Sequence, residues 1–457
     1  MPTGLPASVL PASVLPASVS LAEASRFWLQ LGLVSFGGPA GQIALLHREL
    51  VERRRWLSER RYLHALNYCM LLPGPEAMQL ATYLGWLMHG IPGGLIAGGL
   101  FVLPSVFVLT ALAFVYALWG QLPLLAAVFA VLKPTVLAIV VMAAWRIGRR
   151  TLRTPLLAGL AIAGFLALTL LQLPYPLLVI SAGLIGLLTA RWRPALLVAG
   201  PAHAASGESA AQHQSAALHD DHSATPDHAR FSRRRLAGTL LAWAVALLLP
   251  LAALVIAGGW NGILALMARF FTRVALLSFG GAYAVLPYVA QGAVDQFGWL
   301  SASQMLDGLA LGETTPGPLI MVVAFVGFMG GWNQGLAADG PGNGALALAA
   351  TLVTVWFTFL PSFGFILAGG PLVEASRGDL LFGAPLSAIT AVVVGLIASL
   401  AVFFAGPVLW PAGTFNPWAV LVAAAALAAQ LWLRWSVLKV IGAAALGGVL
   451  LAWMRGG

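Results

Sequence analysis

Charge is scarce in this chain. Asp, Glu, Lys and Arg make up 9% of its 457 residues, and 60% of the residues are hydrophobic, whereas soluble globular proteins carry about 25% charged residues. A water-soluble fold of this length has no means of hiding so much apolar surface, so the bilayer must be its solvent. The net charge of +9 does not indicate nucleic acid as a partner, because the arginines cluster at the ends of apolar runs, where the positive-inside rule places them.

Cysteine and enzyme signatures are also missing. The single cysteine, Cys69, lies in an apolar stretch, which excludes a disulfide framework and favours a buried free thiol over a redox role. The sequence has no Gly-x4-Gly-Lys-Ser/Thr phosphate loop, so we do not expect ATP hydrolysis. We therefore expect no enzyme activity, no cofactor and no metal in the transport site, and a driving force that comes from a gradient.

Long apolar runs are what the sequence has in abundance. They lack the strict alternation of a β-barrel, and most are long enough to cross roughly 30 Å of hydrocarbon, which takes about 20 residues in a helix. This pattern predicts an all-α integral membrane protein. The runs fall at about 24–47, 62–90, 92–118, 122–146, 155–172, 174–190, 236–258, 265–290, 303–330, 345–372, 380–405, 417–433 and 436–454.

Two segments stand outside these runs. Residues 1–20 repeat Leu-Pro-Ala-Ser-Val without a basic n-region, which predicts a low-complexity tail rather than a signal peptide. Residues 191–235 hold five of the eight histidines. Their order His219-Asp220-Asp221-His222 suits a metal, but we interpret the stretch as a solvated cytoplasmic linker. The remaining chain divides into a first repeat (21–190), a connecting transmembrane helix (236–258) and a second repeat (259–457).

An internal duplication underlies the two repeats. A shift of 243 residues (280 minus 37) places motifs of the first repeat on matching motifs of the second. Composition bias does not keep Gly-Gly, Trp and Pro-Gly-Pro in one register over some 40 residues. The matching motifs are Ser35–Gly38 with Ser278–Gly281, Trp56–Ser58 with Trp299–Ser301, Pro73–Pro75 with Pro316–Pro318 and, after an insertion of 14 residues (257 minus 243), Pro104-Ser105 with Pro361-Ser362.

The charges predict that the repeats have opposite orientations. Residues 290–304 contain no basic residue and carry Asp295, whereas residues 47–61 are rich in arginine. The positive-inside rule places residues 47–61 in the cytoplasm and residues 290–304 outside. One extra crossing at 236–258 produces that inversion. We expect the arginines to attract anions to the cytoplasmic mouth. They are Arg48, Arg53, Arg54, Arg55, Arg60 and Arg61.

Two topologies remain open at this stage. Arginines at 146–153 and 191–235 also favour the cytoplasm, and they conflict with 47–61 if each of the first four runs crosses the bilayer. The conflict disappears if 24–47 and 62–90 are re-entrant hairpins, broken at Phe36-Gly37-Gly38-Pro39 and at Pro73–Pro75. The alternative is thirteen full crossings with one loop that violates the rule.

The four Pro/Gly breaks are the predicted substrate site. They remove helical hydrogen bonds that lipid cannot replace, so they belong where they are buried or line a watery cavity. Helices that restart after the breaks direct amide N–H groups and positive dipole ends at this centre, which suits an oxyanion. The alternative is that the breaks are kinks needed only for packing. The predicted binding residues at the breaks are Ser35, Phe36, Gly37, Gly38, Pro73, Gly74, Pro75, Glu76, Gln79, Ser278, Gly280, Gly281, Thr315, Pro316, Gly317 and Pro318.

Ionisable residues at membrane depth are also candidates. Lys133 lies near the middle of the fourth run, and Thr390 is its counterpart in the second repeat. A central lysine costs about 2.5–3.5 kcal/mol on insertion scales, so we predict that Lys133 binds substrate, with a snorkelling or internally paired lysine as the alternative. Glu76 and Glu313 are candidates for proton coupling, for pairing with Lys133 or for capping a helix end.

The motifs of the repeat resemble the chromate ion transporter superfamily. The resemblance rests on Gly37-Gly38, Val51, Trp56 and Pro73–Pro75, on their recurrence in the second repeat, and on residues 73–86, which are similar to the two-domain form of the family. It covers nearly the whole chain outside the tail and the linker. It implies chromate efflux that confers resistance, with sulfate as a related substrate, in a bacterial inner membrane.

We therefore expect a secondary active exporter of chromate or a related tetrahedral oxyanion. The expected partners are the oxyanion and membrane lipids, and a second copy of the chain is a further candidate. One alternative is a sulfate or oxyanion importer or proton symporter on the same scaffold. Others are an anion channel and a membrane scaffold that transports nothing.

Overall fold

The computed structural model describes residues 19–192, 226–337, 342–376 and 383–456. Over these residues its regular secondary structure is entirely helical. The N-terminal tail up to residue 18 and linker residues 193–225, with the predicted His219–His222 cluster, lie outside the described residues.

The helices follow the apolar runs, but most of the predicted breaks divide a run in two. The first repeat contains α1 (Leu21–Val34), α2 (Gly38–His47), η1 (Arg48–Arg53), α3 (Glu59–Leu71), α4 (Glu76–Trp119), α5 (Pro123–Thr151), α6 (Pro155–Thr169) and α7 (Tyr175–Trp192). The connection contains η3 (Asp227–Ala229) and α8 (Arg233–Gly258). The second repeat contains α9 (Ile263–Leu277), α10 (Ala282–Ala290), η4 (Gln291–Gln296), α11 (Ala302–Thr314), η5 (Leu319–Met321), α12 (Val322–Ala337), α13 (Gly344–Ser376), α14 (Gly383–Leu409), η6 (Pro411–Gly413), α15 (Pro417–Leu431) and α16 (Val437–Gly456).

Helix length separates membrane-crossing helices from shorter arms. Among the described residues, seven helices are long and apolar enough to cross a bilayer, in α4, α5, α7, α8, α13, α14 and α16. The chain is therefore a multi-pass membrane protein. By contrast, α1 has 14 residues and α3 has 13, so each extends for only about 20 Å at 1.5 Å per residue. Neither arm alone can cross the hydrocarbon core.

In the first repeat both broken segments fold back on themselves. The ring of Trp56, beyond the second arm of the first segment, lies 4.9 Å from the ring of Phe27 in the first arm. Across the second break, the rings of Tyr68 and Tyr83 are 5.8 Å apart, whereas a straight helix would separate residues fifteen positions apart (83 minus 68) by about 22 Å. Each segment therefore returns to the level at which it started.

The second repeat has the same two hairpins. Trp299, the counterpart of Trp56, lies 5.5 Å from the ring of Phe270, the counterpart of Phe27. Across the other break, Asn333 Nδ2 on α12 donates to the carbonyl of Trp299, at 2.9 Å. The fold is thus all-α with two homologous repeats of paired hairpins, and it adopts the re-entrant topology in place of thirteen full crossings.

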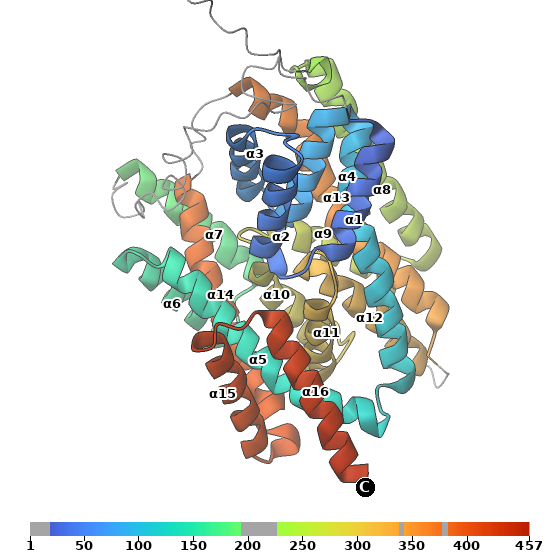
Figure 1. The fold of residues 1–457 in the computed structure, drawn as a ribbon, viewed down its shortest axis with the longest axis vertical. Helices are drawn as coiled ribbons and strands as arrows, with labels where there is room; N and C mark the ends of the chain where they lie inside the picture. The colour runs from blue at the N-terminus through green and yellow to red at the C-terminus, as the bar shows by residue number, and fades with distance from the viewer. Residues whose placement is uncertain (1–18, 193–225, 338–341, 377–382, 457) are drawn as a thin grey trace, which may run out of the picture.

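The hairpins of the two repeats meet at their breaks. In the view of Figure 1, α2 (blue) and α10 (yellow) are drawn near the middle of the molecule. Around them, α13 packs against α4 and α9, and α4 also packs against α12. The later helices form a second group, in which α5 packs against α14, α15 and α16, and α14 also packs against α6 and α7. The connecting helix α8 has no buried residue.

Candidate functional site

The breaks of the two repeats exchange backbone hydrogen bonds. The amide of Gly74 donates to the carbonyl of Ser278 at 3.0 Å, and the amide of Gly317 donates to the carbonyl of Ser35 at 2.7 Å. The 243-residue shift turns the first bond into the second. Such an exchange is what a two-fold relation between the repeats produces, so all four breaks converge at one place, which we call the crossing.

Glycine is required at the crossing because the backbones approach closely. Gly74 has φ +134° and Gly317 has φ +106°, values that L residues rarely adopt. A Cβ on Gly74 would overlap the hydroxyl of Ser362, and one on Gly317 would overlap the hydroxyl of Ser105. The recurrence of Pro-Gly-Pro and Pro-Ser in both repeats thus has a structural basis, because the Pro-Gly-Pro of each repeat contacts the Pro-Ser of the other.

Polar side chains surround the crossing, and some lack partners. Gln79 Nε2 donates to the carbonyl of Pro73 at 2.8 Å and to Ser362 Oγ at 3.3 Å, and the Ser105 hydroxyl donates to the carbonyl of Pro316. The hydroxyl of Ser35 and Oε1 of Gln79 are buried with no hydrogen-bond partner among the described residues. Buried polar atoms of this kind indicate a place where a polar ligand or water binds.

The helices that restart at the crossing have no side-chain cap. This holds for α2, α4, α10 and η5. Three of the four hairpin arms that begin away from the crossing differ, because Ser20, Ser58 and Ser301 cap α1, α3 and α11 with their hydroxyls, whereas α9 begins after Gly262 without a side-chain cap. The first amides of a helix need partners, so the uncapped N-termini offer donors and positive potential to an anion.

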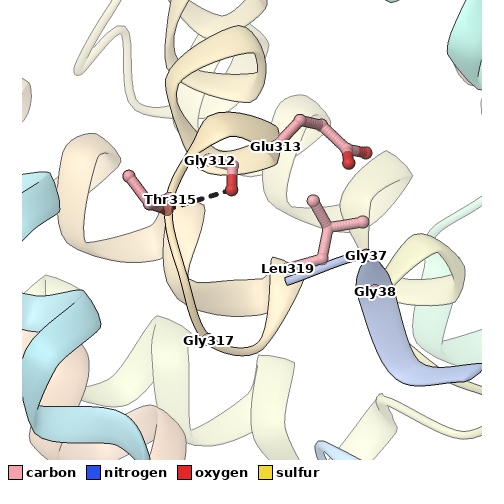
Figure 2. Close-up of a pocket in the computed structure, with 7 residues that line it drawn as sticks. All are labelled: Gly37, Gly38, Gly312, Glu313, Thr315, Gly317 and Leu319. Atoms are coloured by element: carbon pink, nitrogen blue, oxygen red, sulfur yellow. Dashed lines mark hydrogen bonds between the residues drawn. The ribbon is translucent and has the colours of Figure 1, made fainter. Parts of the chain in front are cut away.

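A pocket lies where two of these N-termini meet. Figure 2 shows Gly37 and Gly38, at the start of α2, facing the loop between Thr315 and Leu319, with the Glu313 carboxylate on the same side as the Leu319 side chain. The Thr315 hydroxyl is turned back to the carbonyl of Gly312, at 3.0 Å. The pocket encloses about 200 Å³ of space including its mouth, and it is lined by Gly37, Gly38, Gly312, Glu313, Thr315, Gly317 and Leu319.

Glu313 is the one acidic residue of that lining, and two residues that the sequence did not single out accompany it. The hydroxyl of Tyr283, on α10, donates to Glu313 Oε1. Arg146, near the end of α5, interacts electrostatically with both of them, and its Nη2 lies 3.5 Å from Gln430 Oε1. The sequence showed Arg146 only as one of a cluster of cytoplasmic arginines, and Tyr283 carried no signal beyond following Gly281.

The two-fold counterpart of this pocket is chemically different. There the carboxylate of Glu76 takes the place of Leu319, since Glu76 Oε1 is 3.9 Å from the position of a Cβ on Gly281. Glu76 therefore places a carboxyl group beside the N-terminus of α10. The pocket at Gly37 and Gly38 has Leu319 at the equivalent position on the η5 side, so the duplication leaves two unequal sites.

Lys133 does not line the pocket. Its Nζ lies 3.4 Å from Asp307 Oδ2 and donates to Ser303 Oγ at 2.6 Å. Asp307 is buried and also accepts a hydrogen bond from the Tyr116 hydroxyl, at 2.8 Å. In this structure Lys133 is paired with Asp307 rather than with either candidate glutamate, and its role in substrate binding stays a prediction.

The arginine-rich segment is divided between the surface and the interior. Arg53 Nη1 lies 2.8 Å from Glu49 Oε1, and the guanidinium of Arg54 lies over the rings of Phe27 and Trp56. Arg61 is buried, with Nη2 3.8 Å from Glu374 Oε2. Arg48, Arg53, Arg54, Arg55 and Arg60 are on or near the surface, as an anion-attracting loop requires, whereas Arg61 faces the second repeat.

Comparison with known proteins decides the family. The family described as chromate transporter matches the chain over residues 22–187 and 265–449, which are the two repeats. The chain belongs to the chromate transporter family. The matched regions leave out the tail, the linker and the whole of the connecting helix α8, in agreement with the resemblance seen in the motifs.

Several members of this family align with the chain. The chromate transport protein of Pseudomonas aeruginosa is 32% identical over 81% of this chain and 78% of its own length. The probable chromate transport protein of Synechococcus elongatus is 30% identical over 75% of this chain and 76% of its own. A shorter relative, the uncharacterized transporter YwrA of Bacillus subtilis, is 30% identical over 34% of this chain and 88% of its own length. No solved structure matches the chain.

Proposed function

We propose that this transporter exports chromate, or a related tetrahedral oxyanion, from the cytoplasm across a bacterial inner membrane by secondary active transport, and thereby confers chromate resistance. The observation that carries the proposal is the convergence of uncapped helix N-termini at the crossing. The names of the Pseudomonas and Synechococcus relatives support chromate as the substrate.

The chemistry of the pocket fits a small oxyanion. Backbone amides at the starts of α2 and η5 supply donors, and the helix dipoles supply positive potential without a charged side chain. We propose that Gly37, Gly38, Thr315 and Gly317 contact the anion and that Ser35 and Gln79 hold it through water or directly.

The membrane potential is sufficient to drive export. Moving one elementary charge across a potential of 100 mV changes the free energy by about 2.3 kcal/mol, so a dianion that leaves a negative interior at 100 mV releases about 4.6 kcal/mol. ATP is not needed for such a step. The surface arginines of 48–60 would raise the local anion concentration at the cytoplasmic mouth, which speeds loading.

Glu313 favours a second candidate, an oxyanion–proton symporter that works in the direction of import. A carboxylate in the pocket repels a dianion unless it is protonated, so the proton and the anion would move together. The groups that face Glu313 are Tyr283 on α10 and Arg146 on α5. Arg146 would partner the ionised carboxylate in the empty state and the oxyanion in the loaded state.

Reconstituted flux distinguishes the two candidates. We expect purified protein in liposomes to move labelled chromate, with sulfate as competitor, in response to an imposed potential. For a potential-driven exporter, Glu313→Gln keeps this flux and a pH gradient alone drives none. A symporter instead responds to the pH gradient, and Glu313→Gln abolishes that response while anion exchange persists. A flux that does not saturate with chromate concentration would exclude both candidates and indicate a channel. Absence of any flux would favour a membrane scaffold.

A further inference from the structure

Two buried charge clusters lie outside the pocket, and each joins one repeat to the other. In the first, Glu374 on α13 accepts a hydrogen bond from the Tyr83 hydroxyl at 2.6 Å, and its other oxygen lies 3.8 Å from Arg61. In the second, Asp307 on α11 accepts a hydrogen bond from Tyr116 at 2.8 Å and pairs with Lys133 at 3.4 Å. Each cluster consists of a carboxylate, a tyrosine and a cation.

The clusters lie on opposite sides of the crossing. Ser105 and Ser362 mark the crossing on α4 and α13, because Ser105 donates to the carbonyl of Pro316 and Ser362 lies against Gly74. Tyr116 lies eleven residues beyond Ser105 and Glu374 twelve residues beyond Ser362, which is about 16 and 18 Å along the respective helices. Since the repeats are inverted, the same direction along α4 and α13 leads to opposite faces of the membrane.

Each cluster fastens a hairpin of one repeat onto the long helix of the other. Arg61 and Tyr83 belong to the α3–α4 hairpin, and Glu374 fastens it to α13, where the Tyr68 hydroxyl also donates to the carbonyl of Phe365 at 2.9 Å. Asp307 belongs to the α11–α12 hairpin and fastens it to α4 and α5. Both hairpins carry a Pro-Gly-Pro loop at the tip, so both reach the crossing.

The duplication does not account for the clusters. The position of Asp307 corresponds to His64 (307 minus 243), and the position of Glu374 corresponds to Ala117 (374 minus 257). The same chemistry is thus built at both faces from residues that are not counterparts. A buried ion pair contributes little net stability, so separating its two side chains is inexpensive if each finds another partner. Removing one partner by mutation is strongly destabilising, because the other charge is left buried and unpaired.

We propose that the two clusters are the gates of the transport cycle, with Arg61–Tyr83–Glu374 closing access from the cytoplasm and Lys133–Tyr116–Asp307 closing access from outside. This inference rests on the proposed function as a transporter with alternating access. Both clusters are formed in this structure. Opening one gate while the other stays shut exposes the pocket to one side only.

A matched pair of thiol reporters tests the gates without measuring flux. Cys69 is the only cysteine of the chain. It is fully buried on α3, about two turns along the helix from Arg61 of the first cluster. Its counterpart is Gly312 on α11 (69 plus 243), where a Cβ would meet Val322 at an ordinary 3.5 Å. Gly312→Cys in a Cys69→Ala background is therefore the mirror reporter. A membrane-impermeant maleimide, applied to either face of vesicles, reads out each side.

We expect Glu374→Gln to raise the rate of Cys69 labelling from the cytoplasmic face at least tenfold while labelling of Gly312→Cys from outside does not rise. Asp307→Asn should do the reverse, and Lys133→Ala should behave like Asp307→Asn. The milder Tyr83→Phe and Tyr116→Phe variants should shift labelling in the same directions, which covers the case in which a charge variant does not fold.

Two results would overturn the gates. One is a parallel rise of both reporters in every variant, with loss of a monodisperse size-exclusion peak, which marks the clusters as structural ties. The other is unchanged labelling in all variants that remain monodisperse. Failure of the proposed function looks different, because the reporters would then shift as described while wild-type proteoliposomes carry no chromate.

Discussion

Gly74 and Gly317 are the residues on which the crossing depends. Each combines a backbone conformation that favours glycine with a neighbour that leaves no room for a Cβ. Their amides hold the two repeats together through Ser278 and Ser35. A side chain at either position would therefore strain the loop and separate the repeats at the same time.

We predict that Gly317→Ala lowers the apparent melting temperature in detergent and abolishes chromate flux. A left-handed conformation costs a non-glycine residue about 1–3 kcal/mol, and the overlap with the Ser105 hydroxyl adds to that cost. Gly99→Ala on α4 is the control, because a Cβ there meets nothing within 4 Å. An unchanged melting temperature for Gly317→Ala would contradict the close approach.

At this scale the sequence could predict the breaks but not their neighbours. Pro-Gly-Pro and Gly-Gly recur in register, and their local chemistry already determines that a helix stops and restarts there. The proximity of Glu313 to Tyr283 and Arg146 depends on how α5, α10 and α11 pack. No spacing rule relates residues so far apart in the chain, so Lys133 was placed with the substrate and its partner Asp307 was missed.

The hairpins are the elements that set the depth of the site. Three of their four outer ends carry serine caps, and the helices that restart at their inner ends begin after glycine or proline without a side-chain cap. The arginine distribution favours the hairpin topology, because re-entrant hairpins put residues 47–61, 146–153 and 191–235 on one face, but it leaves thirteen full crossings open. The burial of Arg61 could not be inferred, because its partner Glu374 lies in the other repeat.

We predict that Arg53→Gln together with Arg55→Gln raises the apparent KM for chromate several-fold at low salt and leaves the maximal flux unchanged. Both arginines are exposed on the loop before α3, so their effect is a field that concentrates anions. The Debye length falls from about 10 Å at 0.1 M to about 3 Å at 1 M salt. Wild type and variant should therefore converge at high salt, and a KM difference that persists there would exclude this role.

The whole molecule consists of two repeats with α8 between them. The family matches both repeats separately, and α8, which buries no residue, adds the one crossing that inverts the second repeat. Positive charge on the segment before α3 and its absence from the segment before α11 agree with this inversion.

We predict that a cysteine at Arg54 is labelled from the cytoplasm and a cysteine at Asp295 from outside, each in a Cys69→Ala background. Both positions are exposed and precede equivalent hairpins. The measurement is reaction with an impermeant maleimide in intact cells and in inverted vesicles. Labelling of both sites from the same side would show that the repeats share one orientation.

The exchanged hydrogen bonds at the crossing have a consequence for any chain with a single repeat. Such a chain would hold a glycine donor whose acceptor serine it could reach only in another molecule. To complete the centre, two copies would have to insert in the membrane facing opposite ways. A protein built on one repeat of this plan should therefore insert in the membrane in both orientations. Otherwise it should require a second, homologous chain that inserts in the opposite orientation.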